Sequence, residues 1–353
     1  MKKLLSLSML LMATVLFAQE EEKPKLSITG SVDAYYRANI TAPNDENAIA
    51  PNSSFANLPG FALGMANIVF GYEGEKTGFV ADLVFGPRGT DAVFASPMYG
   101  NPYFNADGDL SFAGTGNIIN QLYAYWNVSE SVKLTMGNFN TFLGYEVISP
   151  TANFNYSTSY LFSYGPFSHT GIKADIALSD DFSLMLGVMN NTDLTEFNPT
   201  GDYAFGAQLG YSGQFLNFLL DPSFTEIDFT GGFDLSDEFY LGINAAYLDV
   251  EDAGSFAGAA LYPQYSISDA FTLGLRGEYF METEVGVGAI GAYDAAGDGS
   301  VLALTLTGSL EIENLTIKPE LRLDSASEEA FIDNDLAGTK SLGSFVLAAI
   351  YSF

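Results

Sequence analysis

The chain has 353 residues and carries 13 Lys and Arg against 43 Asp and Glu, a formal net charge of −30. This balance argues against nucleic-acid binding, because contacts to phosphate need a basic surface. With no cysteine and a single histidine, His169, the sequence predicts no disulfide, no metal site and no cofactor.

The N-terminal segment has the composition of a processing signal. Lys2 and Lys3 precede an apolar run that ends at the small residue Ala18, and polar residues follow it. This series is typical of a secretory signal peptide, although Leu16 stands where a small residue is usual. The run is short for a retained membrane helix. We expect a signal peptide over residues 1–18 and a single domain over residues 19–353.

Runs of alternating apolar and polar side chains fill the rest of the chain. Successive side chains of a strand point to opposite faces, so each run predicts a strand. Sixteen strands are expected, over residues 26–40, 61–73, 78–88, 117–128, 132–141, 169–179, 182–190, 202–212, 215–221, 225–235, 239–250, 255–267, 271–283, 299–312, 315–326 and 342–353. The weakest of them is 215–221, which is apolar on both faces.

The connections between these strands alternate in length. Short turns fall at 73–77, 129–131, 179–181, 212–214, 236–238, 268–270 and 313–314. Longer links fall at 41–60, 89–116, 142–168, 191–201, 251–254, 284–298 and 327–341, with one short exception at 222–224. Outer-membrane barrels have short periplasmic turns and long extracellular loops, which is the same asymmetry.

The segment from Leu315 to Ser325 shows the alternation most clearly. One face carries Leu315, Ile317, Pro319, Leu321 and Leu323, and the other carries Thr316, Lys318, Glu320, Arg322 and Asp324. In a closed barrel the apolar face can contact lipid while the charged face lines a wet interior. Pro319 has no N–H to give to a ladder, so a bulge or local bend is expected there.

A soluble β-sandwich is the main alternative fold, because its strands alternate too. A sandwich requires neither the regular succession of short and long links nor the aromatic last residue, Phe353. A final strand that ends in Phe resembles the signal by which the barrel-assembly machinery recognises its substrates. We therefore predict an all-β fold, a transmembrane antiparallel β-barrel of about sixteen strands, integral to the outer membrane.

A barrel of this size encloses an aqueous channel, which predicts passive diffusion of small hydrophilic solutes and ions. Strand parity turns these candidate pore-lining residues inward: Asp33, Arg37, Lys133, Lys173, Asp175, Glu226, Asp228, Arg276, Glu278, Lys318, Glu320 and Arg322, with Asp82 and Asp324 beside them. Charged strand residues must avoid lipid, and this alone would place them inside the barrel. The narrower interpretation is a transverse field, in which basic strand residues face acidic groups across a constriction. Acidic residues outnumber basic ones, so we expect a mild cation preference.

The link within residues 137–171 is unusually aromatic. Between Thr141 and Ser168 its one charged residue is Glu146, which is unusual for an exposed loop of so acidic a chain. We predict that loop 141–168 folds into the barrel mouth and constricts the pore, with Glu146 at the constriction. An aromatic cap over the pore or a subunit contact would explain the composition equally well.

The same region carries a resemblance to a known family. The stretches "GNFNTFLGYEVISP", "NYSTSYLFSYGPFSHTG" and "IKADIALSDDFSLMLGVMN" resemble the OmpL-like outer-membrane β-barrel porins of Gram-negative envelopes, most clearly over about 117–250. The resemblance implies an outer-membrane porin and brings no catalytic residues with it.

Other functions have weaker support. Ser168 and His169 are adjacent on a predicted strand and so point to opposite faces, which argues against a hydrolase, and we expect no enzyme. The acidic turns 105–109, 294–300 and 333–335 do not fit the EF-hand pattern. The alternative function is a structural or adhesive barrel whose extracellular loops, at 41–60 and 89–116, bind a partner. Assembly into a homo-oligomer stays open.

Overall fold

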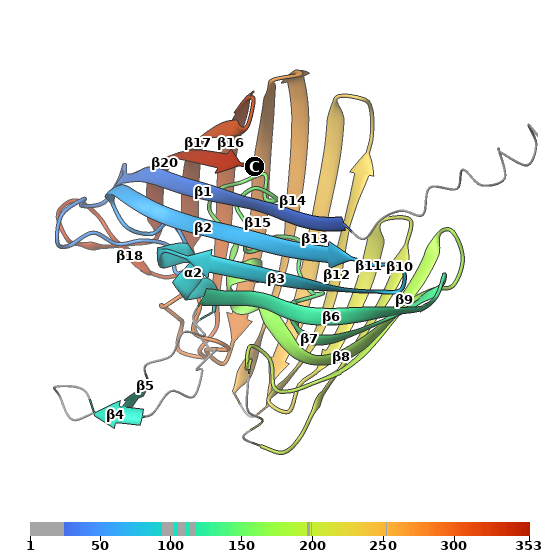
Figure 1. Cartoon of the computed structure of the whole chain (residues 1–353). Coiled ribbons are helices and arrows are strands. Elements are labelled where there is room, and N and C mark those ends of the chain that lie inside the picture. The colour runs from blue at the N-terminus through green and yellow to red at the C-terminus, as the bar shows by residue number, and fades with distance from the viewer. Residues whose placement is uncertain are drawn as a thin grey trace, which may run out of the picture.

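The fold is a closed β-barrel, shown by a computed structural model that describes residues 25–93, 102–104, 110–112, 118–195, 198, 200–251 and 253–353 (Figure 1). All sixteen barrel strands are antiparallel and pair in chain order. The predicted fold class is therefore confirmed. The expected signal peptide, the turn 105–109 and most of the link 89–116 lie outside the described residues.

The barrel strands follow the predicted segments within a few residues. They are β1 (Lys25–Asn39), β2 (Gly60–Glu73), β3 (Thr77–Phe85), β6 (Ile119–Ser129), β7 (Val132–Asn140), β8 (Ser168–Ala177), β9 (Phe182–Met189), β10 (Ala204–Tyr211), β11 (Gln214–Leu220), β12 (Phe224–Asp234), β13 (Phe239–Val250), β14 (Gly254–Ser268), β15 (Phe271–Thr283), β16 (Gly299–Ile312), β17 (Leu315–Ala326) and β20 (Ser341–Ser352). Two small sheets, β4 (Pro102–Phe104) with β5 (Leu110–Phe112) and β18 (Phe331–Ile332) with β19 (Gly338–Thr339), lie apart from the barrel sheet.

The first and last strands close the barrel. Their ladder runs from Ser31 paired with Ser352 to Asn39 paired with Ser344. Phe353 extends it, because its N–H donates to the carbonyl of Gly30 and its own carbonyl accepts from the N–H of Gly30, both at 3.0 Å. The C-terminal residue therefore lies in the closing seam, where no unpaired sheet edge remains between β1 and β20.

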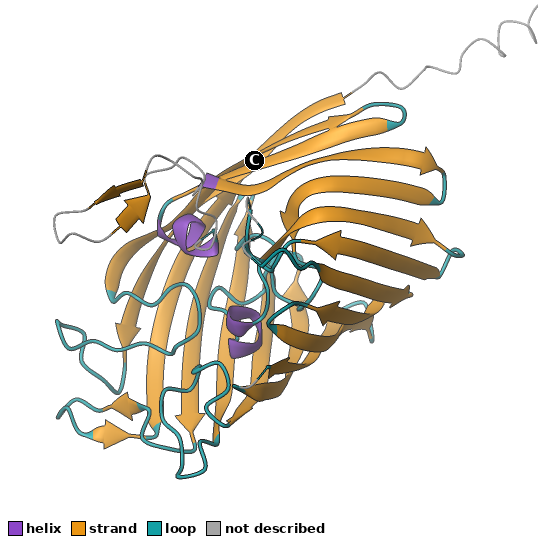
Figure 2. Cartoon of the chain, turned by 90° about the horizontal axis from the view of Figure 1, so that it is seen from below, coloured by secondary structure: helices purple, strands orange, loops and turns teal. Residues whose placement is uncertain are grey.

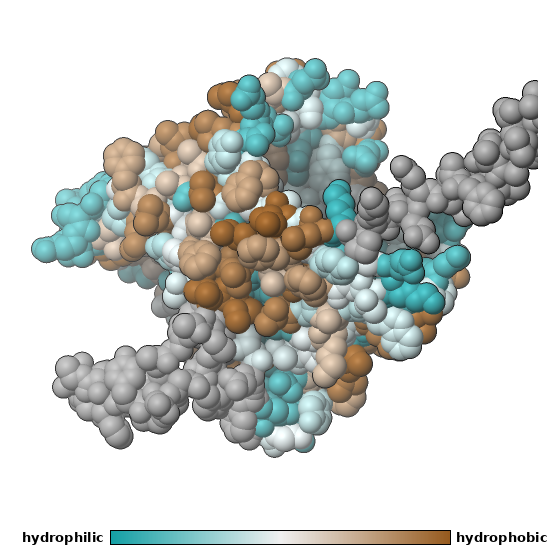
Figure 3. Space-filling model, in the orientation of Figure 1, coloured by the Kyte–Doolittle hydropathy of each residue, from teal (hydrophilic) through white to brown (hydrophobic). Residues whose placement is uncertain are grey.

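The outer surface of the barrel is apolar. On β17, Leu321 and Leu323 are 49% and 47% exposed, whereas the intervening Arg322 is 4% exposed and points inward. Apolar side chains gather in the middle of the face over β1 to β3, and hydrophilic ones lie at its two ends (Figure 3). In the described part of the chain, no helix is long and apolar enough to cross a membrane. An apolar outer face of this kind is what a transmembrane barrel presents to lipid.

Of the bulge or local bend expected at Pro319, the bulge is absent. The pairing of β16 with β17 is interrupted at Lys318 and Pro319 and resumes in the same register, with Leu310 opposite Ile317 and Thr307 opposite Glu320. On the other side, Pro319 stays in register opposite Leu347 of β20. The missing N–H is therefore accommodated by a gap in one ladder and not by an inserted residue.

Candidate functional site

The link between β7 and β8, residues 141–167, lies inside the barrel and is called the inserted loop below. Its short helix α3 (Tyr160–Tyr164) lies within the ring of strands (Figure 2). Tyr156 and Tyr160 are 1% and 2% exposed. We call residues 145–161 the tip of the inserted loop and its two ends, 141–144 and 162–167, the root. Wall side chains contact both parts, but the chemistry differs between them.

Glycines on the wall make room for the aromatic side chains of the tip. Gly274 on β15 lies so close to the ring of Phe154 that a Cβ at this position would overlap it. Gly242 on β13 has the same relation to the ring of Tyr145. Tyr145 in turn stacks on Tyr262 with a centroid separation of 4.3 Å. Because glycine has no side chain, the rings of Phe154 and Tyr145 can lie directly against the backbone of the wall.

Arg276 on β15 binds the tip most extensively. Its Nη1 donates to Glu146 Oε1 and to the carbonyl of Ser157, both at 2.6 Å. Its Nη2 donates to the carbonyl of Thr158 at 3.2 Å. The Arg276 side chain is 0% exposed and that of Glu146 is 3% exposed, so removing either partner would leave a buried charge unpaired.

Arg322 on β17 binds the tip from the neighbouring wall. Its Nη1 donates to the carbonyl of Thr158 at 2.8 Å and to Ser53 Oγ at 2.9 Å. Its Nη2 pairs with Asp324 Oδ1 at 2.8 Å. The guanidinium therefore connects the tip with the loop 40–59, which links β1 to β2.

Two further cations bind backbone carbonyls of the tip. Lys318 Nζ donates to the carbonyls of Asn153 at 2.5 Å and Phe154 at 2.9 Å. Arg88, in the short helix α2 (Pro87–Ala92), donates through Nε to the carbonyl of Ile148 at 2.9 Å. Lys318 was among the predicted pore residues and Arg88 was not. The expected strand 78–88 is too long at its end, because β3 stops at Phe85 and Arg88 lies in a helix that the pattern did not indicate.

Wall carboxylates accept from backbone N–H groups of the tip. Glu278 on β15 accepts from Tyr160 at 3.0 Å and Leu161 at 2.8 Å. Glu320 on β17 accepts from the N–H of Tyr156 at 2.9 Å. These bonds satisfy backbone donors that a buried loop could not otherwise pair.

The hydroxyl of Tyr156 reaches the opposite wall. It donates to Asp33 Oδ2 on β1 at 2.5 Å. Burial and the nearby Asp33 carboxylate raise the pKa of Tyr156 above its ordinary value, so the phenol keeps its proton and stays a donor. With Glu278 and Glu320, Asp33 completes a set of wall acids around the tip.

The root of the inserted loop rests on acidic side chains. Asp228 on β12 accepts from the N–H of Gly144 at 3.1 Å. Asp193, in the link 190–203, accepts through Oδ1 from Phe167 at 2.8 Å and Ser168 at 2.7 Å. Burial raises the pKa of Asp193 to about 6, although these two backbone donors oppose the shift. No basic side chain among the described residues donates to either carboxylate.

The remaining predicted pore residues lie away from the tip. Lys173 and Asp175 on β8 form an ion pair at 2.9 Å, and Lys133 on β7 lies 3.7 Å from Asp175. All three are partly exposed, and Lys133 and Asp175 border a cavity of about 750 Å³. Arg37 is 1% exposed and has one long bond, 3.4 Å to the carbonyl of Ile49.

The predicted residues therefore fall into separate groups. The tip gathers Asp33, Glu146, Arg276, Glu278, Lys318, Glu320 and Arg322, the root gathers Glu226 and Asp228, and the β7–β8 wall gathers Lys133, Lys173 and Asp175. Arg37 belongs to none of these groups. Parity predicted which side chains point inward, but not which of them meet the loop.

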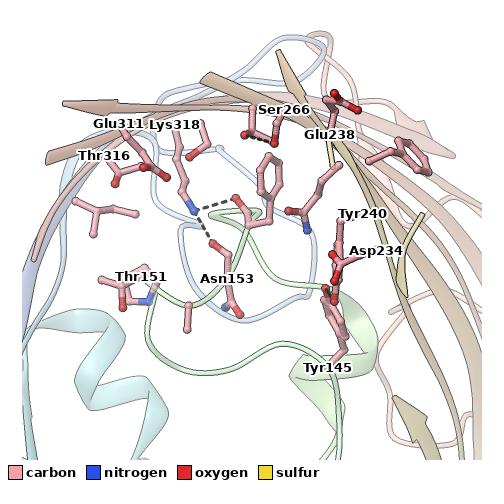
Figure 4. A pocket seen from close by; sticks show the side chains of 18 of the residues that line it. Tyr145, Thr151, Asn153, Asp234, Glu238, Tyr240, Ser266, Glu311, Thr316 and Lys318 are labelled. Carbon is pink, nitrogen blue, oxygen red and sulfur yellow. Dashed lines mark hydrogen bonds between the residues drawn. The ribbon is translucent and has the colours of Figure 1, made fainter. Parts of the chain in front are cut away.

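A second cavity, of about 490 Å³, lies between the tip and the turn 235–238 and is called the vestibule (Figure 4). Tyr145, Asn153 and Phe154 of the tip form part of its lining. Its charged lining residues are Asp234, Asp237, Glu238, Glu311 and Lys318. The Lys318 amine is bonded to tip carbonyls, so the free charges of the vestibule are acidic. The turn 235–238 is one of the short, periplasmic-type connections.

His169, on β8, packs against the inserted loop. Its Nε2 lies 2.9 Å from Thr141 Oγ1, and its ring packs 5.1 Å from that of Phe142. Ser168 donates its backbone N–H to Asp193, and its hydroxyl makes no hydrogen bond to His169. The pair thus joins the inserted loop to β8 and shows no nucleophile–base geometry.

The acidic turns 294–300 and 333–335 close on themselves. Asp294 Oδ1 accepts from the N–H groups of Ala296 and Asp298, and Asp333 Oδ1 accepts from Asp335 and Ala337. Within the described residues, no group of three or more His, Cys, Asp or Glu could hold a metal ion. These carboxylates act as turn-forming acceptors.

Comparison with known proteins gives one family and several similar folds. The family model described as "Putative beta-barrel porin-2, OmpL-like" matches residues 25–353. No curated protein matches the chain. Among solved structures, the outer membrane channel DcaP of Acinetobacter baumannii has a TM-score of 0.58 at 12% identity, over 94% of this chain and 97% of that one.

Two further structures have a similar fold. An anion-selective porin from Comamonas acidovorans has a TM-score of 0.56 at 11% identity, over 94% of this chain and 100% of that one. A loop-deletion mutant of OmpT, an outer membrane protein of Vibrio cholerae, has a TM-score of 0.54 at 12% identity, with the same two coverages. At these identities the likeness concerns the fold alone.

Proposed function

Because the chain belongs to the OmpL-like β-barrel porin family, we propose that it passes small hydrophilic solutes and ions by passive diffusion, with the inserted loop as its constriction. The observation that carries this proposal is the ring of wall side chains bonded to the tip. Four cations and three acids from β1, β15, β17 and the helix α2 converge on one short segment inside the lumen. A loop bound on several sides occupies the cross-section that a solute must pass.

The sign of the selectivity follows from which charges stay free. Arg276, Arg322 and Lys318 are bonded to the tip or to a carboxylate, so their fields are largely compensated locally. The vestibule keeps Asp234, Asp237, Glu238 and Glu311 against one bonded lysine. We therefore attribute the mild cation preference to the vestibule and not to a transverse field between strands.

The two partly exposed lysines of β7 and β8 oppose this preference. Lys133 and Lys173 outnumber the carboxylate that they share, Asp175, but Glu75, Lys76 and Glu130 line the same cavity and bring this side of the lumen close to neutral. The net preference is therefore modest. The anion selectivity of the Comamonas porin belongs to that protein and does not transfer at 11% identity.

Processing and assembly belong to the same proposal. Residues 1–18 would be removed as a signal peptide, and residues 19–353 would form the single barrel domain. The barrel-assembly machinery would recognise Phe353 before this residue pairs with Gly30 in the closing seam. The position of Phe353 beside Gly30 supports a role in the last step of barrel closure. Association of several barrels is compatible with passive diffusion through each one.

The test is conductance of the purified, folded protein in a planar bilayer with a salt gradient. We expect stepwise openings and a reversal potential of the sign that cation preference gives. The triple variant Asp234→Asn, Glu238→Gln, Glu311→Gln should move that potential toward anions. A protein that folds as a barrel but never conducts would contradict the porin proposal and favour loops that bind a partner.

A further inference from the structure

Glu226 is a buried acid that none of the contacts described above uses. It lies on β12, points into the lumen beneath the root, and is 3% exposed. Its Oε2 has no hydrogen-bond partner among the described residues. The root passes directly over it, because a Cβ built at Gly165 would lie 3.7 Å from Glu226 Oε1. A buried oxygen of this kind is rare and calls for a physical reason.

Among the described residues, no positive charge compensates this carboxyl group. The small cavity that it borders, about 10 Å³, is lined by Leu143, Gly144, Leu161, Phe162, Gly165, Pro166, Asp228, Asn244 and Ala246. The root contributes no ionisable group to this lining. The charged groups that act on it electrostatically are Asp228 on the same strand and Asp193 from the link 190–203, and both are acidic.

The neighbouring amide side chains do not donate hydrogen bonds to Glu226 either. Asn217 on β11 donates to Asp228 Oδ1 at 2.5 Å, and Asn244 on β13 donates to Asp228 Oδ2 at 2.6 Å. Both carboxylate oxygens of Asp228 therefore have hydrogen-bond donors. Glu226, two residues along the same face, has neither donor nor counter-charge.

The packed root is therefore compatible with only one form of Glu226. A buried carboxylate without partners is costly, and a second negative charge beside Asp228 adds repulsion. The neutral acid avoids both penalties. To become ionised, Glu226 needs water or a cation at Oε2, and the cavity beneath Gly165 and Pro166 has no room for a hydration shell unless the root moves.

We propose that Glu226 is a proton-operated latch on the inserted loop: protonated, it lets the root pack against the wall, and ionised, it displaces the root and opens the constriction. The proposal rests on the inserted loop being the constriction of a porin. Displacement acts on both ends of the loop, because Gly144 and Gly165 flank the same acid pair. The ligand of this site is a proton, and its effect is on the open fraction of the pore.

The experiment compares the full-length, folded wild type with Glu226→Gln and with Asp269→Asn. Asp269 lies in the exposed turn between β14 and β15 and controls for the loss of one negative charge. Single-channel open fraction and hydrogen exchange of residues 141–167 are measured between about pH 5 and about pH 9, a range wide enough for a buried carboxyl group to titrate. Heat-modifiable mobility verifies that each barrel has folded.

We expect the open fraction and the exchange rate of the root to rise several-fold with pH in wild type and in Asp269→Asn. In Glu226→Gln both should stay at the low-pH level. A rise of the same size in Glu226→Gln, or no rise in wild type, would overturn the latch. A wild type that is silent at every pH would instead count against the porin function, while hydrogen exchange would still decide the latch.

Discussion

The tip and the root of the inserted loop are bound to the same barrel by opposite electrostatic means. At the tip, Arg276 and Arg322 donate to loop carbonyls and to carboxylates, so each buried charge has a partner. At the root, Asp193 and Glu226 are buried, and no basic side chain in the described part of the chain pairs with either of them. The difference indicates that the tip contributes fixed structure, whereas the root is the part that proton concentration can move.

The largest expected effect is at the tip. Arg276→Ala removes the bonds to Glu146 and Ser157 and leaves the Glu146 carboxylate buried and unpaired. Breaking a buried pair in this way costs about 3–5 kcal/mol, so the tip should detach and single-channel conductance should rise. The control is Lys340→Ala, whose ion pair with Glu328 is exposed at 3.8 Å and contributes below about 1 kcal/mol. Equal conductance changes in both variants would contradict the comparison.

The root should make the stability of the folded protein depend on pH. The raised pKa of Asp193, about 6 against an ordinary 3.8, means that the folded state binds more protons than the unfolded state between these values. Stability should therefore fall by about 1–3 kcal/mol as the pH rises through this window. Asp193→Asn keeps an acceptor for Phe167 and Ser168 and should remove this slope. Urea unfolding at several pH values measures it, and an unchanged slope in the variant would refute the assignment.

Packing at the tip can be tested without changing any charge. Gly274→Ala adds a Cβ where the ring of Phe154 lies, and overpacking of this kind costs about 1–3 kcal/mol. We expect faster hydrogen exchange at residues 150–158 and a higher conductance. Gly277→Ala on the same strand is the matched control, since its nearest neighbour is a leucine methyl at 3.7 Å. If both variants behave alike, the ring does not occupy that space.

The smallest effect concerns helix α3, which begins in the tip and continues into the root. Ser159 Oγ caps α3 by accepting from the N–H of Phe162 at 3.0 Å and also donates to Glu146 Oε2 at 2.6 Å. Ser159→Ala should cost about 1 kcal/mol and increase exchange at residues 160–164 with little change in conductance. Ser159→Asp, which can cap but would repel Glu146, should be worse than alanine. Recovery by aspartate would mean that capping alone matters.

The wall was predictable from sequence because period-two alternation is a local property. The alternation within each strand indicates which of its faces contacts water. On β17, the position of Arg322 between Leu321 and Leu323 suffices to orient the strand. The weak prediction at β11 has a physical reason. Leu219 points inward but packs with Leu143 and Met189 in an apolar cluster, so the loop makes that part of the inner face apolar.

The contacts of the inserted loop were not predictable in this way. Arg276 and Glu146 are separated by 130 residues, and no local pattern pairs them. Arg88 ended an expected strand, 78–88, but the chain turns there into a short helix, and no pattern connects it with the inserted loop. The composition of the loop indicated that it is buried, while its partners depend on the closed barrel bringing β1, β15 and β17 around it.

The most direct test of the account is a variant in which residues 145–161 are replaced by a short Gly-Ser linker. Its single-channel conductance is compared with that of wild type in the same bilayer and salt. Because the tip is the proposed constriction, we predict a several-fold larger conductance from a barrel that still shows heat-modifiable mobility. A folded variant with the conductance of wild type would contradict the claim that the inserted loop constricts the pore.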